Sequence, residues 1–341
     1  MYILPISQLL IIAVLAGMTA CTNCAEIEGG MDSTLEGTIV PISVGESGGI
    51  TSATWVSRDK ELLVGSDSGL YLLSPEHGGV LWVKSGGATL VAAGIGGEYA
   101  ATSHHSPHSI EDSLVRLWHV PTRSLLAQFT IKGIVSSLGL LGERDKIISC
   151  TSTQCIVVSV ESRERLVLDW PHTQLMSVEG RPNQAYVLRQ SASGRFRYDV
   201  LELESMRHIG FLVADRGVTQ SAISTDEKLA IIASYPSYQF IIGANSDGTT
   251  AVIDLQSGRQ RYCLQSKVDM GSPSIPRVAL RGGKLFIAGR HGVSLRHQDS
   301  GASIGMIKCN ARDSEAFTVS GDGSKIFFGG PARTGAIIHL K

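Results

Sequence analysis

One pattern restarts seven times between Ile50 and Lys341: an apolar strand, a polar turn and a more hydrophobic strand, then a second strand–turn–strand unit. The strands are β-branched or aromatic runs such as ELLVGS, KIISC and KLFIAG, and turn-forming residues bound them. The starting turns are Asp59, Gly96-Gly97, Asp145, Pro182-Asn183, Asp226, Gly282-Gly283 and Asp322-Gly323. They lie about 40 to 55 residues apart, which is the spacing of propeller blades. The sequence therefore predicts an all-β, seven-bladed β-propeller of four-stranded antiparallel blades.

The second half of each repeat keeps the same plan, as in LVRLWHVPTRSLLAQFT. Within that stretch, Val115-Arg116-Leu117-Trp118-His119 resembles the end of the third strand in the WD-repeat family, with His119 in the place of the family's aspartate. The other repeats keep the length and the turn without this dipeptide. The resemblance implies a WD-repeat-like architecture from Ile50 to Lys341.

The seventh repeat ends after its third strand, so one strand is missing from the last blade. Residues 37–44, which precede the first complete blade, are the obvious donor. Pro41 suits an outermost strand because proline cannot donate to a central ladder. We therefore expect this N-terminal strand to complete the last blade and close the ring, giving one propeller domain of residues 37–341.

The first 20 residues contain no charged side chain, and their apolar stretch has the length of a signal-peptide core. The stretch Leu15-Ala16-Gly17-Met18-Thr19-Ala20-Cys21 resembles a bacterial lipobox, which implies that Cys21 is lipidated and becomes the mature N-terminus. A signal peptide cleaved without lipidation and an uncleaved anchor are the alternatives. The two residues after Cys21, Thr22 and Asn23, are not aspartate, so the resemblance implies an exported protein anchored to the outer membrane on its periplasmic face. Residues 21–36 are predicted to be a flexible tether.

Cysteine usage points to an oxidising compartment. Cys150 and Cys155 flank four turn-like residues, which places their side chains opposite each other across a hairpin. We predict a disulfide between them, with two buried free thiols as the alternative. Cys24, Cys263 and Cys309 receive no partner from the sequence.

The loop face is the end of the propeller that carries the connections between second and third strands together with the loops joining successive blades. We expect function there. Residues 103–112 of blade two form its most suggestive loop, with His104, His105 and His108 near two carboxylates. Imidazole and carboxylate groups ligate Zn²⁺, but the spacing matches no known motif. Contact with a protein or ligand and a simply solvated loop are the alternatives to a metal site.

Two further loops are candidates for binding. Blade five has the longest insertion, residues 235–248, in which Tyr235, Tyr238 and Phe240 either anchor an interface or pack over the blade. Blade four places Arg195 and Arg197 in a small basic loop. These arginines could receive an acidic partner or a lipid headgroup, or they form a solvated hairpin tip.

Composition argues against several functions. Thirty Lys and Arg against 31 Asp and Glu give a formal charge of −1, without the basic excess typical of nucleic-acid binding. No Gly-x-Ser-x-Gly elbow, P-loop or dinucleotide fingerprint is present, so we expect no catalytic residues and no cofactor.

Three functions remain open. The first is a non-enzymatic scaffold that binds other envelope proteins and is tethered to the membrane by its N-terminal lipid. The second is a propeller enzyme or a protein with a redox or metal cofactor, which would need ligands facing the channel. The third is a binder of a small ligand or glycan in the central channel.

Overall fold

A computed structural model gives the three-dimensional structure of the 341-residue chain. It describes residues 25–26, 34–45, 48–105, 112–141, 146–169, 173–177, 184–190, 196–202, 211–212, 218–223, 229–234, 247–254, 260–267, 277–289, 292–309, 315–331 and 333–341. For residues 173–249 the description covers the strand backbones alone.

The described strands form seven sheets, each built on four antiparallel strands, and one of these sheets also has a parallel fifth strand, β1 (Ala25–Glu26). Blade one comprises β3 (Ile50–Val56), β4 (Glu61–Ser66), β5 (Gly69–Leu73) and β6 (Val80–Ser85). Blade two comprises β7 (Leu90–Ala93), the short 3-10 helix η2 (Ile95–Gly97), β8 (Tyr99–His105), β9 (Asp112–His119) and β10 (Ser124–Lys132). Blade three comprises β11 (Ser137–Leu141), β12 (Lys146–Cys150), β13 (Cys155–Ser159) and β14 (Arg165–Leu168).

The remaining blades follow the same order. Blade four comprises β15 (Thr173–Ser177), β16 (Gln184–Gln190), β17 (Phe196–Glu202) and β18 (Phe211–Leu212), and blade five comprises β19 (Val218–Ile223), β20 (Leu229–Ser234), β21 (Asp247–Asp254) and β22 (Gln260–Lys267). Blade six comprises β23 (Arg277–Arg281), β24 (Lys284–Gly289), β25 (Gly292–His297) and β26 (Ser303–Ile307). Blade seven comprises β27 (Ala316–Val319), β28 (Lys325–Gly329), β29 (Thr334–Leu340) and the N-terminal β2 (Gly37–Ser43).

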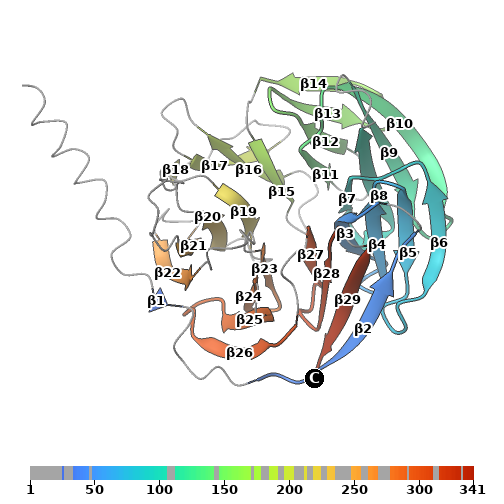
Figure 1. Ribbon diagram of the computed structural model, residues 1–341. Coiled ribbons are helices and arrows are strands. Elements are labelled where there is room, and N and C mark those ends of the chain that lie inside the picture. The colour runs from blue at the N-terminus through green and yellow to red at the C-terminus, as the bar shows by residue number, and fades with distance from the viewer. Residues whose placement is uncertain are drawn as a thin grey trace, which may run out of the picture.

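The seven sheets stand around a common centre (Figure 1). Their first strands contact one another in order, from β3 through β7, β11, β15, β19 and β23 to β27, and β27 contacts β3 again. The ring is therefore closed, and the predicted seven-bladed β-propeller of four-stranded blades is confirmed.

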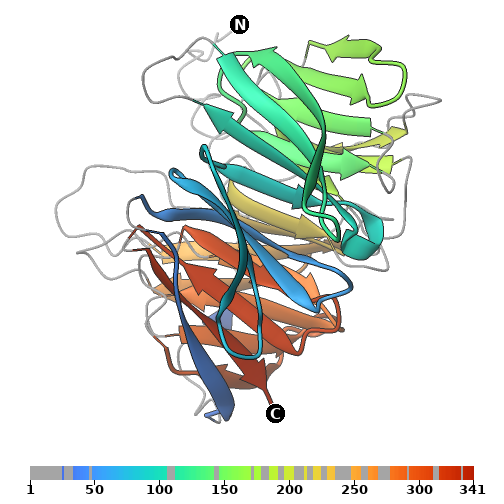
Figure 2. The same cartoon turned by 90° about the vertical axis from the view of Figure 1, so that its right-hand side faces the viewer.

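Closure depends on the predicted terminal strand. Strand β2 pairs antiparallel with β29 over seven residues, from Gly37 opposite Leu340 to Ser43 opposite Thr334. Figure 2 shows these two terminal strands side by side. Pro41 lies on the outermost strand, where its missing N–H breaks no central ladder, as expected.

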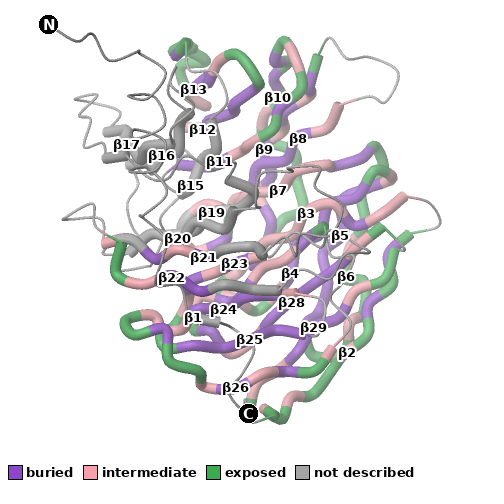
Figure 3. The backbone as a smooth tube through the Cα atoms, turned by 60° about the vertical axis from the view of Figure 1, so that its left-hand side comes forward, coloured by how far each residue is buried: buried purple, intermediate pink, exposed green. Residues whose placement is uncertain are grey.

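The hydrophobic core lies between neighbouring blades. One cluster joins blades seven and one through Phe327, Ile337, Ile50 and Leu62, and equivalent clusters join other adjacent blades. Figure 3 shows the buried residues running along the inner strands, while the outermost strands β6 and β2 carry exposed positions. Burial on both faces explains why the middle strands read as continuous apolar runs.

The predicted disulfide between Cys150 and Cys155 is present. The two residues face each other across the hairpin of β12 and β13, with their Cα atoms 4.0 Å apart, and both are fully buried. Cys263 on β22 is disulfide-bonded as well, although no partner could be assigned to it from the sequence alone. Cys309 is a free, half-buried thiol.

The segment 21–36 differs from the expected free tether wherever the structure describes it. Strand β1 (Ala25–Glu26) joins β22 in parallel as a fifth strand of blade five. Thr34 bridges Met306, and the Leu35 N–H donates to the Met306 carbonyl at 3.0 Å. The physical reason is that the outer strands β22 and β26 offer unpaired backbone groups, which this segment satisfies. In the part of the chain that the structure describes, no helix is long and apolar enough to cross a membrane.

Candidate functional site

A cavity of about 240 Å³ lies at one end of the central channel. It is lined by the inner strands of blades one, two, three, six and seven and by the turns that follow several of them. These turns join first to second strands, so this end, which we name the turn face, is opposite the loop face where function was expected. The side chains and backbone that shape its rim are Trp55, Arg58, Asp59, Gly97, Arg281 and Gly321.

The rim is built on an unusual turn in blade one. Ser57, Arg58 and Asp59 all have positive φ, at 53°, 54° and 63°. For residues with a Cβ this conformation costs about 1 to 3 kcal/mol each, and it persists only where surrounding contacts fix it. The N–H groups of Ser57 and Arg58 donate to the carbonyls of Gly97 and Gly96, at 3.0 and 3.2 Å. Blade two therefore holds the turn in place.

Blade seven fixes the same turn from the other side. The Asp59 carboxylate accepts the Gly321 N–H at 2.7 Å, and the Asp59 carbonyl accepts the Lys325 ammonium at 2.9 Å. The Lys325 nitrogen also lies 5.8 Å from the centre of the Trp55 ring, a cation–π distance. The cavity rim is thus a rigid junction of three blades.

Two guanidinium groups line this rim. Trp55 is 7% exposed; its indole N–H has no hydrogen-bond partner among the described residues but is buried away from the cavity. Arg58 is exposed at the mouth, and Arg281 is half-buried beside it. The Asp59 carboxylate already accepts a backbone N–H. Chemically, the cavity is suited to a small ligand that carries acceptor oxygens or negative charge.

The histidines of blade two lie on the loop face. His104 and His105 end β8, and their rings are 6.4 Å apart. Gly87 has a φ of 68°, and a Cβ there would collide with the His104 imidazole, so glycine permits the ring to lie against this loop. The Nδ1 atom of His104 has no hydrogen-bond partner among the described residues.

Burial lowers the pKa of His104, and the nearby charges of Arg116 and His105 lower it further, against an opposing effect of Asp67. The imidazole is therefore held neutral near pH 7. A neutral imidazole is the form that binds metal ions. Yet within the described ranges no group of three or more His, Cys, Asp or Glu residues could hold a metal. His108 falls outside those ranges.

Exposed apolar side chains are concentrated on outermost strands. The described part of the chain has nine exposed large hydrophobic residues, of which only Ile134 lies off such a strand. Ile39 is on β2, and the other seven are on β6, β10 and β14 of three consecutive blades. We name these seven the outer apolar surface: Val80, Leu81, Val83, Leu125, Leu126, Leu166 and Val167.

The side chains of the other predicted site residues lie outside the described part of the structure. Cys21, Tyr235, Tyr238, Phe240 and Arg195 lie outside the described residues, and only the backbone of Arg197 is described, on β17. Among the expected binding residues whose side chains are described, the structure brings His104 and His105 together.

Sequence reasoning missed the turn-face cavity. Its lining comes from five separate repeats, and no single motif marks it. The turn Ser57-Arg58-Asp59-Lys60 carries no distinguishing signal, because Arg144-Asp145-Lys146 stands at the same place in blade three.

No protein-family model matches the sequence, and no curated protein does. By structure, 1291 chains of solved structures match. One of them is titled "Kuenenia stuttgartiensis Hydrazine Synthase"; it is 10% identical, with a TM-score of 0.68, over 92% of this chain and 99% of that one. At this identity the likeness supports the fold alone, and the chain is a β-propeller.

Proposed function

We propose that the protein is an exported, lipid-anchored, WD-repeat-like propeller that acts as a non-enzymatic scaffold for other envelope proteins. The observation that carries the proposal is the outer apolar surface. Edge strands of soluble proteins usually carry charges or proline against unwanted pairing. Here β6 exposes Val80, Leu81 and Val83 at 48, 42 and 53%.

The surface has the features of a binding site. Its residues lie in three groups, one on the outer strand of each of blades one, two and three. Apolar patches that a monomer leaves exposed commonly mark protein interfaces. Outer strands also present unpaired backbone groups, to which a partner can add a strand. The expected partner is an envelope protein that offers an extended apolar segment.

Photo-crosslinking in intact cells tests this function. A photoreactive amino acid placed singly at Val83, Leu126 or Val167 should capture one and the same envelope protein from all three positions. The matched control is Gln260, an exposed residue on the outer strand of blade five, which should not capture it. Different adducts from the three positions, or the same adduct from Gln260, would contradict the proposed surface.

The lipid anchor is tested separately. A fatty-acid probe supplied during growth should label the wild type and should not label Cys21→Ser. Labelling that survives the substitution would contradict lipidation at Cys21, while the crosslinking result would stand unaffected.

A second function, binding of a small anion at the turn face, is favoured by the two arginines that line the cavity, Arg58 and Arg281. Citrate and phosphate serve as probes, with binding followed by calorimetry and by tryptophan fluorescence. Arg58→Gln should weaken binding at least tenfold, whereas Arg165→Gln, at an exposed site on β14, should not change it. Equal affinity in both variants would exclude this site.

A further inference from the structure

We infer that Cys24 is the disulfide partner of Cys263, and that this bond holds the start of the mature chain against the outer strand of blade five. The disulfide itself stands on the cysteine count and the strand register. Its consequence for the membrane rests on the lipid anchor proposed above.

The cysteine count leaves two possible partners. The chain has six cysteines, of which Cys150 and Cys155 are bonded to each other. Cys263 is disulfide-bonded, and Cys309 is a free thiol. Burial raises the pKa of Cys309 to about 11, so its thiolate is scarce and exchanges slowly. Cys21 and Cys24 remain.

The register of β1 on β22 selects between them. These strands run parallel, with Ala25 opposite Leu264 and Glu26 opposite Gln265. Continuing this register by one residue would place position 24 opposite Cys263. Neighbouring strands are about 4.8 Å apart, and disulfides span Cα separations of about 4.4 to 6.8 Å. Cys21 lies three residues further along the chain, about 10 Å at strand spacing, which is out of reach.

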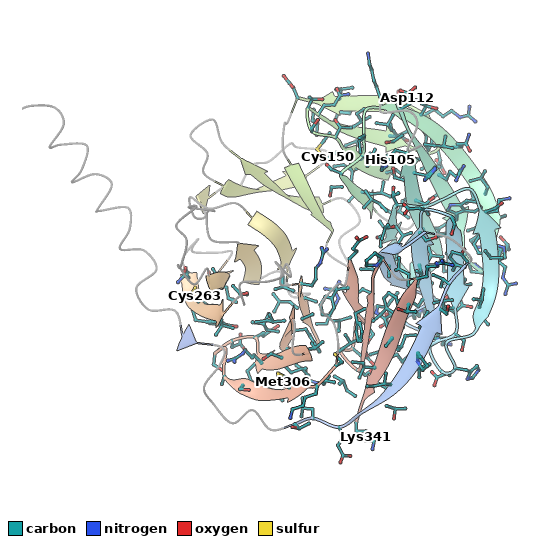
Figure 4. All side chains as sticks on the ribbon, viewed as in Figure 1. His105, Asp112, Cys150, Cys263, Met306 and Lys341 are labelled. Atoms are coloured by element: carbon teal, nitrogen blue, oxygen red, sulfur yellow. A yellow bond between two sulfur atoms is a disulfide. The ribbon has the colours of Figure 1, made fainter. Side chains whose placement is uncertain are left out.

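Burial at Cys263 agrees with this pairing. The outermost strand of a blade is largely solvent-exposed, and Gln260 and Arg261 on β22 are exposed. Cys263 and Leu264 are only 1 and 2% exposed. The change occurs where β1 adds a fifth strand to this blade (Figure 1), and Figure 4 places Cys263 on β22 beside β1. The segment that contains β1 covers this part of β22, so it is the segment that can supply the second sulfur of the disulfide.

The bond forms by ordinary thiol chemistry. The thiols of Cys24 and Cys263 lose two protons and two electrons as the S–S bond forms. An oxidised protein disulfide of the exporting compartment accepts them by thiol–disulfide exchange and leaves as a dithiol. Cys21 takes no part in this reaction, because lipidation converts its sulfur to a thioether.

The bond shortens the link to the membrane. Residues 22 and 23 alone would separate a lipidated Cys21 from the bonded Cys24, a reach of about 10 Å. A free tether of residues 21–36 would instead reach about 50 Å. Blade five would therefore sit next to the bilayer. Blades one and two lie across the ring from it (Figure 1), so much of the outer apolar surface would face away from the membrane toward a partner.

Peptide mapping of the full chain, purified from membranes in detergent, tests the assignment. Free thiols are alkylated without reduction, and a protease that cuts after Glu26 releases the peptide of residues 21–26. We expect this peptide to be joined to the one containing Cys263, with only Cys309 alkylated. In Cys24→Ser, alkylation of Cys263 should rise from near zero to near completeness, and Cys309→Ser is the matched control without that effect. A wild-type map that links Cys263 to Cys21, or that shows Cys24 alkylated, would overturn the inference.

The same peptide separates the two proposals. A mass that includes lipid on Cys21 supports the anchor, and a disulfide to Cys263 supports the pairing. A linked peptide without lipid would refute the lipid anchor and support the disulfide. A lipidated peptide in which Cys24 is alkylated would support the lipid anchor and refute the disulfide.

Discussion

Replacing Ile42 by alanine should open the seam at which the ring closes. Ile42 lies on β2, is 2% exposed, and packs in the cluster that joins blades seven and one. Truncating a buried isoleucine to alanine costs about 2 to 5 kcal/mol, because apolar burial is lost and a cavity remains. For a domain of roughly 300 residues this corresponds to a fall in Tm of about 3 to 8 °C.

The same strand provides the control. Ile39 is also on β2 but is 51% exposed, so Ile39→Ala should change stability by less than about 0.5 kcal/mol. Thermal unfolding followed by circular dichroism, together with denaturant unfolding, measures both variants against the wild type. Equal effects of the two substitutions would refute the reasoning, since they would show that β2 does not bury Ile42 in the last blade.

Three further predictions concern local features. Cys155→Ser should lower the free energy of unfolding by about 2 kcal/mol, which is the loop-closure value for so short a loop. Denaturant titrations without reductant measure this change. An unchanged midpoint would show that the bond to Cys150 does not restrain the chain. Burial lowers the pKa of His104 in the folded protein below the ordinary value of 6.5. At a pH just below 6.5 the unfolded chain therefore binds more protons at this residue than the folded protein does. Stability should therefore fall as the pH drops from 7.5 to 5, and His104→Gln should lose less Tm over that range; identical losses would argue against the shift. A Cβ at Gly292, where φ is 135°, would collide with the Ile307 carbonyl, so Gly292→Ala should prevent stable folding, while Gly289→Ala, with nothing within 4 Å, should fold normally by circular dichroism.

The blades were predictable because their information is local. Strands such as β4 and β12 are short apolar runs between turn formers, and the structure places them at the expected residues. The missing strand was predictable by counting, and Pro41 indicated its outer position. The hairpin disulfide followed from the four-residue separation of Cys150 and Cys155.

The parts that could not be predicted depend on contacts between distant segments. Strand β1 has only two residues, Ala25 and Glu26, which is too short to show the alternation of apolar and polar side chains that would predict its pairing with β22. The disulfide state of Cys263 follows from that pairing and was missed with it. The turn-face cavity arises only when several inner strands meet, so its indole and guanidinium groups, Trp55 and Arg58, gave no signal as a set.

A pair of cysteines placed across the two terminal strands, β2 and β29, tests the closure of the ring most directly. Ser43 lies opposite Thr334 in the pairing of β2 with β29. Opposed residues of antiparallel strands have Cα atoms about 4.5 to 5.5 Å apart, which permits a disulfide. The double variant Ser43→Cys/Thr334→Cys should form this bond on mild oxidation, as detected by peptide mapping, and Thr38→Cys/Thr334→Cys should not. No bond in the first variant, or equal bonding in both, would contradict a ring closed by its N-terminal strand.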